Sequence, residues 1–106
     1  MQIRAYIDPQ GRKPFKAWFD RLQDPRAKAA IKRRLDFFLR GGWGDTKYCR
    51  GGVWEMRFDL GPGHRVYFGR DGGSLVLLLG GGDKVSQQRD LDRAVEAWRD
   101  YVEQTR

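Results

Sequence analysis

Residues 53–70 read VWEMRFDLGPGHRVYFGR, and the pattern of this segment is the strongest indication of the fold. Its first eight residues alternate apolar and charged side chains, the period-two pattern of a half-buried strand, with Trp54, Met56, Phe58 and Leu60 as the apolar members. Gly61-Pro62-Gly63 has the composition of a turn, and residues 64–70 resume the strand pattern. The stretch therefore predicts a β-hairpin with one apolar face and one charged face.

The sequence that follows predicts a third strand. After the turn residues Gly69–Gly73, the segment Ser74–Leu79 contains an unbroken aliphatic run, and Gly80-Gly81-Gly82 ends it. A strand that is apolar at consecutive positions is buried on both faces, so we expect it in the interior of the sheet.

Helical patterns flank the strands. A short strand at Ile3–Ile7 precedes one amphipathic helix with apolar residues at i, i+3, i+4 and i+7, namely Phe15, Trp18, Phe19 and Leu22. Asp24-Pro25 gives the second helix an N-cap and a proline at its first position, and Gly41-Gly42 ends it. A last helix has an apolar stripe of Leu91, Ala94, Val95, Trp98 and Val102. We read Gly41–Gly52 as a glycine-rich connection.

The element order is therefore β-α-α-β-β-β-α. It predicts an α+β fold, with a small antiparallel sheet, an N-terminal helical hairpin and a C-terminal helix, in a single domain over residues 1–106.

The amino-acid composition limits the partners and the cell compartment that we expect for the protein. The chain has 21 Lys and Arg residues against 14 Asp and Glu, a formal charge of +7, which favours a polyanionic partner such as nucleic acid or an acidic protein segment. The single Cys49 allows no internal disulfide, and the N-terminus has no signal-peptide pattern. The aliphatic run Leu75–Leu79 is too short to cross a membrane. We expect a cytoplasmic protein with no membrane contact, no metal and no cofactor.

The charged face of the hairpin is the candidate site. If Gly61-Pro62-Gly63 is a three-residue loop, Leu60 lies opposite His64, Phe58 opposite Val66 and Met56 opposite Phe68. Asp59 would then face Arg65 and Arg57 would face Tyr67, with Glu55 one pleat further on, and Lys84 would reach one edge. Two interpretations remain open: solvated cross-strand ion pairs, or an acid–base and phosphate-binding site.

These residues carry a family resemblance. Trp54-Glu55-Met56-Arg57, then Gly61-Pro62-Gly63-His64-Arg65-Val66-Tyr67, then Leu77-Leu78-Leu79-Gly80-Gly81-Gly82-Asp83-Lys84 resemble the signature of HigB-like addiction-module killer proteins, in the RelE/ParE toxin superfamily. The resemblance covers nearly the whole chain, because the first strand, the helices and the last helix follow the family order.

The resemblance implies a toxin of a type II toxin–antitoxin system that cleaves mRNA, usually on the ribosome and without a metal, and so inhibits translation. In that chemistry a ribose 2′-OH attacks the adjacent phosphate, which needs a base, an acid and cations. By alignment, Arg65 is the transition-state stabiliser, Lys84 binds phosphate and Arg57 holds the RNA backbone. Tyr67, Lys47 and Arg50 complete the expected RNA-binding set.

One departure from the family pattern changes the assignments. Many RelE-type toxins have a catalytic Tyr, or a His-Tyr pair, shortly after the position of Lys84, whereas this chain reads Val85-Ser-Gln-Gln-Arg-Asp90. Glu55 then becomes the candidate base, with Asp59 in reserve. His64 is the candidate acid, because histidine titrates near neutral pH, although packing in the turn is the competing role.

Two other functions stay open. ParE-like relatives inhibit DNA gyrase by binding it and need no base, and a phage-derived remnant would not be toxic at all. The family also implies an antitoxin partner, a helix-turn-helix protein encoded next door, through which the complex would bind operator DNA. The mRNA and the ribosome are the other expected partners.

Overall fold

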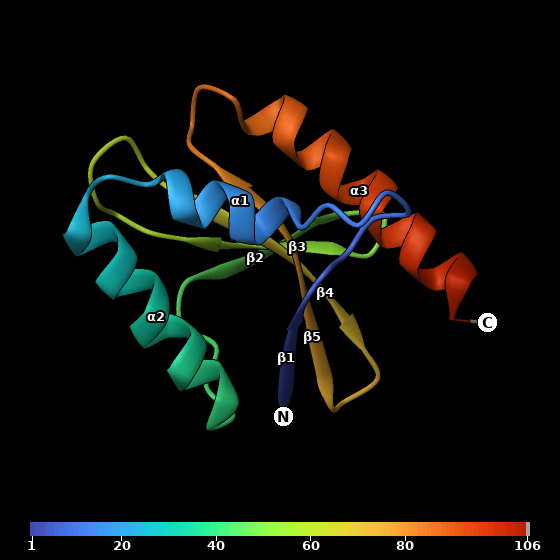
Figure 1. The fold of residues 1–106 in the computed structure, drawn as a ribbon. Coiled ribbons are helices and arrows are strands. Elements are labelled where there is room, and N and C mark those ends of the chain that lie inside the picture. The colour runs from blue at the N-terminus through green and yellow to red at the C-terminus, as the bar shows by residue number, and fades with distance from the viewer. Residues whose placement is uncertain (106) are drawn as a thin grey trace.

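The computed structural model describes residues 1–105, and Figure 1 shows its three helices and five-stranded sheet. The elements in chain order are β1 (Gln2–Ala5), α1 (Pro14–Arg21), α2 (Pro25–Leu39), β2 (Thr46–Arg50), β3 (Val53–Arg57), β4 (Arg65–Asp71), β5 (Leu75–Gly82) and α3 (Gln87–Gln104). The predicted α+β class is confirmed. Among the described residues, no helix has the length and hydropathy that crossing a membrane requires.

The sheet is mixed, so the prediction of a purely antiparallel sheet was wrong. Its strand order is β1-β5-β4-β3-β2, and β1 runs parallel to β5, pairing from Gln2 with Leu75 to Ala5 with Leu78. The other three strand pairs are antiparallel. The reason is connectivity: β1 is joined to β5 through all the intervening elements, and such long connections can return the chain in the same direction. As predicted, β5 is an interior strand.

The segment Gly41–Gly52 contains a strand that the sequence reading missed. Gly51 and Gly52 both have positive φ angles, +59° and +86°, which suits a tight two-residue hairpin turn. The chain therefore reverses there, and Thr46–Arg50 pairs with β3 as the edge strand β2. This places Lys47 and Cys49 on the sheet instead of in a loop.

The β3–β4 register differs by two residues from the expected one. Met56 pairs with Val66 and Arg57 with Arg65, because β3 ends at Arg57 and the connection to β4 is longer than three residues. The amide of Phe58 donates to the carbonyl oxygen of His64 at 3.0 Å and closes this loop. Because the difference is an even number, each residue keeps the sheet face that was predicted for it.

The sheet separates two apolar layers. On one face, the first two helices pack through Phe15, Ile31 and Phe38 against apolar side chains at even-numbered positions of β3, β4 and, as far as Leu78, β5. On the other face, α3 packs through Ala94, Val95 and Ala97 against a set comprising Val53, Tyr67, Leu77 and Leu79. In Figure 1, α1 crosses in front of the strands and α3 lies at the upper right. The predicted helix stripes are confirmed, as is the N-cap, since Asp24 accepts the amide of Arg26 at 2.9 Å.

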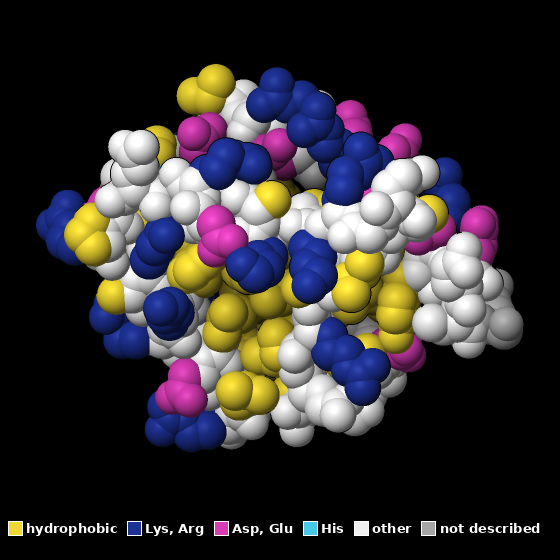
Figure 2. Space-filling model, in the orientation of Figure 1, with side chains coloured by type: hydrophobic (Ala, Val, Ile, Leu, Met, Phe, Trp, Pro, Cys, Tyr) yellow, Lys and Arg dark blue, Asp and Glu magenta, His cyan; other side chains and the backbone are white. Residues whose placement is uncertain are grey.

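The surface carries its cations around exposed apolar side chains. Figure 2 shows a hydrophobic hollow between α2 and β1, with Lys and Arg side chains spread around it and along α3. Partly buried apolar side chains pack against the core on the side of the sheet covered by α1 and α2, among them Ile3, Phe19 and Leu35.

Candidate functional site

A buried ion pair lies at the centre of the charged face. Glu55 on β3 and Arg65 on β4 are diagonal neighbours on the α3 face of the sheet, and Arg65 Nη1 donates to Glu55 Oε2 at 3.1 Å. Glu55 is only 3% exposed and the Arg65 side chain 12%. Of the two interpretations left open by the sequence, solvated ion pairs do not describe this pair, because both side chains are largely removed from water. Each of these buried charges is compensated by the other, so removing either one would leave an unpaired charge away from water.

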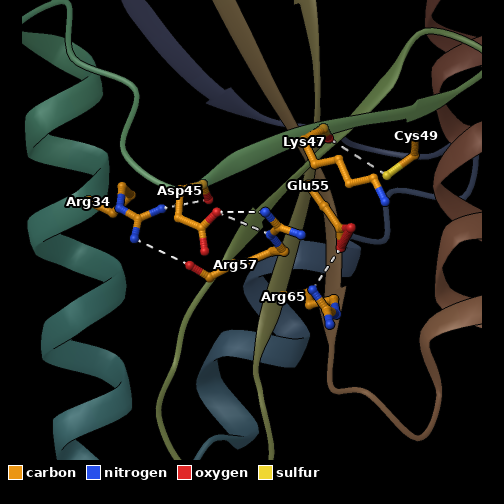
Figure 3. Close-up of polar contacts among 7 residues, drawn as sticks. All are labelled: Arg34, Asp45, Lys47, Cys49, Glu55, Arg57 and Arg65. Atoms are coloured by element: carbon orange, nitrogen blue, oxygen red, sulfur yellow. Dashed lines mark hydrogen bonds and ion pairs between the residues drawn. The ribbon is translucent and has the colours of Figure 1, made fainter.

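The edge strand β2 adds two groups beside this pair. Lys47 pairs directly with Glu55 across the β2–β3 ladder, and Cys49 lies next on the same face (Figure 3). Burial, together with the charge of Glu55, raises the pKa of the Cys49 thiol, so this cysteine stays protonated at neutral pH. Lys47 is exposed and can meet a ligand from solvent.

Arg57 is held at the outer end of the site by Asp45. The guanidinium donates to Asp45 Oδ1 at 2.8 and 3.1 Å, and this contact raises the pKa of Arg57. Arg34 on α2 donates to the carbonyl oxygens of both Asp45 and Arg57, which ties the helix to this corner (Figure 3). The predicted RNA-binding residue Arg57 is therefore brought next to the Glu55–Arg65 pair, with its direction fixed.

Lys84 lies beside the turn that precedes Arg65. A Cβ atom added to Gly63 would come within 2.9 Å of the Lys84 side chain, and the Lys84 amide donates weakly to the Pro62 carbonyl oxygen at 3.5 Å. The side chain is exposed. The expectation that Lys84 reaches one edge of the site agrees with this position.

Three predicted residues lie elsewhere. His64 is buried on the opposite face, where its ring meets the edge of Trp18 at 6.1 Å between centroids, so packing is its observed environment. Asp59 is exposed in the β3–β4 loop and does not face Arg65, because of the changed register. Arg50 forms an ion pair with Asp92 on α3.

Tyr67 is not on an exposed surface either. It pairs with Glu55 across the ladder, as its face predicts, but α3 covers it and its side chain is fully buried. Burial, followed by the charges of Glu55 and Asp90, raises the pKa of Tyr67. Direct contact of this side chain with RNA on an open face was thus a wrong expectation.

Sequence reasoning missed Asp45, Cys49 and Asp90 as neighbours of the site. The first two depend on β2, whose Thr-Lys-Tyr-Cys-Arg sequence before a Gly-Gly pair was the available signal. Asp90 lies against Gly82, which pairs with Arg65, and only the docking of α3 brings it there. Among residues 1–105, no three His, Cys, Asp or Glu side chains form a group that would hold a metal ion.

The arrangement can bind an anion and accept a proton. Arg65 and Lys47 supply cations beside the Glu55 carboxylate, Lys84 adds a third at the turn before Arg65, and the ion pair is made through one oxygen of Glu55. A carboxylate has about four lone-pair positions, so Glu55 retains acceptor capacity.

A separate cleft of about 900 Å³ lies between the Tyr6–Arg21 segment and α3, with Gly80–Gly82 as its floor. Its charged side chains are evenly mixed, among them Arg89, Arg93, Asp90 and Glu96. The cleft borders the candidate site at Gly82 but contains neither Glu55 nor Arg65.

Comparison with known proteins finds a relative of this chain. No family profile matches the chain. An uncharacterized protein of Haemophilus influenzae strain Rd is 42% identical over 80 residues, which is 76% of this chain and 81% of that protein. Identity at this level over most of both sequences indicates common descent and a shared fold. The chain belongs to the same protein family as this Haemophilus influenzae protein.

Proposed function

We propose that the protein is a RelE-like toxin of a type II toxin–antitoxin system, an endoribonuclease that cleaves mRNA on the ribosome without a metal. The observation that carries the proposal is the grouping of Glu55, Arg65, Lys47 and Lys84 around one end of the sheet. Attack of a 2′-OH on the neighbouring phosphate needs such a set, because negative charge develops on the phosphate while a proton leaves the hydroxyl.

Each residue has a role in this proposal. Arg65 stabilises the charge that develops on the phosphate, and Glu55 both orients Arg65 and accepts the proton of the 2′-OH. Lys84 and Lys47 bind phosphate from the solvent side, since both are exposed. Arg57, fixed by Asp45, contacts the RNA backbone at the outer end. The leaving 5′-oxygen takes its proton from solvent, since His64, the expected acid, is buried on the other face and has no part in this mechanism.

The net positive charge of the protein supports the partners that we propose. A surface of net charge +7 suits RNA, and it equally suits an acidic antitoxin segment that would neutralise the toxin. We propose an antitoxin with a helix-turn-helix domain, encoded beside this chain, and DNA contact only through the complex.

One observation favours a second candidate. The carboxylate of Glu55 is nearly fully buried and already bound to Arg65, which suits a structural pair better than a base that meets substrate. A non-catalytic inhibitor of DNA gyrase needs no base and would keep the same fold.

The test compares ribosome-programmed mRNA cleavage by the wild type and by Lys84→Ala, with DNA supercoiling by gyrase measured in parallel. The proposal expects cleavage by the wild type, roughly 10- to 100-fold slower cleavage by the variant, as loss of one charged contact would give, and unaffected supercoiling. Blocked supercoiling without cleavage would support the gyrase inhibitor instead. The matched control is Arg33→Ala, which removes an exposed cation from α2 and should cleave at the wild-type rate.

A further inference from the structure

The hydroxyl of Tyr67 differs from those of the other tyrosines. Tyr6 donates to Asp100 at 2.5 Å, Tyr101 donates to Asp71 at 2.6 Å, and the Tyr48 oxygen accepts the Gly52 amide at 3.1 Å. The Tyr67 hydroxyl is buried and has no hydrogen-bond partner among the described residues. Most buried polar groups in folded proteins are paired, and an unpaired one costs folding free energy. A hydroxyl kept at such a cost points to a use outside folding.

A second unpaired donor lies on the same face. Arg65 precedes Tyr67 by two residues on β4, so both side chains point toward α3. Arg65 donates to Glu55 through Nη1, but its buried Nε has no partner within the described part of the chain. A guanidinium N–H can only donate, and a phenol readily does. Two free donors beside cationic side chains suit an oxyanion and do not suit a metal ion.

We propose that Tyr67 Oη and Arg65 Nε together bind one non-bridging phosphate oxygen of a single-stranded RNA. This inference rests on the proposed function for the identity of the ligand. Glu55 holds the Arg65 fork through Nη1, which leaves the Nε edge directed toward the phosphate. Tyr67 then serves as a second oxyanion donor from the sheet floor, in place of the surface contact that its sequence position suggested.

The ligand reaches these donors by displacing residues 83–90, the segment that leads into α3 together with the first turn of that helix. Polar contacts hold this segment, since Asp83 accepts the amides of Val85 and Ser86, and the Ser86 hydroxyl donates to Asp90. The apolar contacts of α3 begin at Leu91, so the turn can shift without opening the core. Asp90 is the anionic group that covers this end of the sheet, because its carboxylate lies against Gly82, the partner of Arg65.

The experiment pairs two tyrosine variants with opposite expectations. Binding of a fluorescent, single-stranded 2′-O-methyl RNA, which lacks the attacking hydroxyl, is measured at low salt together with a thermal melt of each variant. Tyr67→Phe should weaken binding by roughly 10- to 100-fold, the range for a hydrogen bond to a charged group, while its Tm is equal to or higher than that of the wild type. Tyr6→Phe, which loses the bond to Asp100, should lower Tm and bind RNA normally.

A third variant tests the role assigned to Asp90. Asp90→Asn keeps the size of the side chain and removes its charge, so it should bind the RNA several-fold more tightly. Equal binding by Tyr67→Phe and the wild type, or a lowered Tm of Tyr67→Phe with binding intact, would overturn the proposal, since the hydroxyl would then act only in folding. Failure of the wild type to bind would overturn it as well. Binding of this RNA, together with no cleavage of ribose mRNA on programmed ribosomes, would preserve this site and reject the nuclease.

Discussion

Removing Arg65 should destabilise the protein much more than removing an exposed arginine. The substitution Arg65→Ala leaves Glu55, 3% exposed, without the cation that lies 3.1 Å from its carboxylate. Removing one partner of a buried ion pair costs about 3–5 kcal/mol, against a total of about 5–15 kcal/mol for a domain. At about 4–8 °C per kcal/mol for a domain near this size, Tm should fall by at least about 12 °C.

A double-mutant cycle measures the pair itself. Glu55→Gln and Arg65→Gln are made singly and together, and each protein is unfolded in urea at neutral pH. The double variant has no uncompensated charge, so its loss should be smaller than the sum of the single losses by about 0.5–3 kcal/mol. Single losses that add within about 0.5 kcal/mol would show that the two charges do not depend on each other, and so would an Arg65→Ala variant as stable as the wild type.

Three further predictions concern growth arrest in cells, stability at alkaline pH and the packing of α3 against the sheet. Expression without an antitoxin should arrest growth, and Lys84→Ala should relieve that arrest. The Tm of this variant should be unchanged, because the Lys84 side chain is exposed. Growth equal to that of cells with an empty vector, with folded wild-type protein present, would exclude toxicity. Burial raises the pKa values of Tyr6 and Tyr67, so these two phenols lose their protons at lower pH in the unfolded chain than in the folded protein. The free energy of unfolding should therefore be fully retained below pH about 10. Above that pH it should fall by up to about 1.4 kcal/mol per pH unit for each tyrosine. Tyr67→Phe should make that slope shallower, and an identical slope would contradict this source of the effect. Gly69→Ala places a Cβ 2.2 Å from the Trp98 ring and should cost about 1–3 kcal/mol by urea unfolding, whereas Gly73→Ala, in open space, should be nearly neutral.

Local patterns in the sequence were sufficient for most of the elements. The aliphatic run Leu75–Leu79 correctly predicted an interior strand, and the 3.6-residue stripes correctly predicted the buried faces of the helices. Alternation also placed Glu55, Arg65 and Tyr67 on one face, because parity along a strand survives a register error of two residues.

The features that could not be predicted from the sequence depend on contacts between segments far apart in the chain. The strand containing Lys47 and Cys49 is short and polar, and it is stabilised as a strand by pairing with β3. The parallel β1–β5 pairing follows from the path of the whole chain. Burial of Glu55 and Tyr67 depends on which helix covers their face, and strand alternation carries no information about that.

The chemical ends of the cleaved RNA show whether the protein is the proposed nuclease. Wild-type protein is added to ribosomes programmed with a defined mRNA, the cleaved nucleotide is identified, and the reaction is repeated with a 2′-deoxy nucleotide at that position. Because the 2′-OH is the proposed nucleophile, we expect a 2′,3′-cyclic phosphate or 3′-phosphate on one product, a 5′-hydroxyl on the other, and no cut at the deoxy position. Cleavage that persists at the deoxy position would contradict it, as would intact mRNA together with blocked gyrase supercoiling.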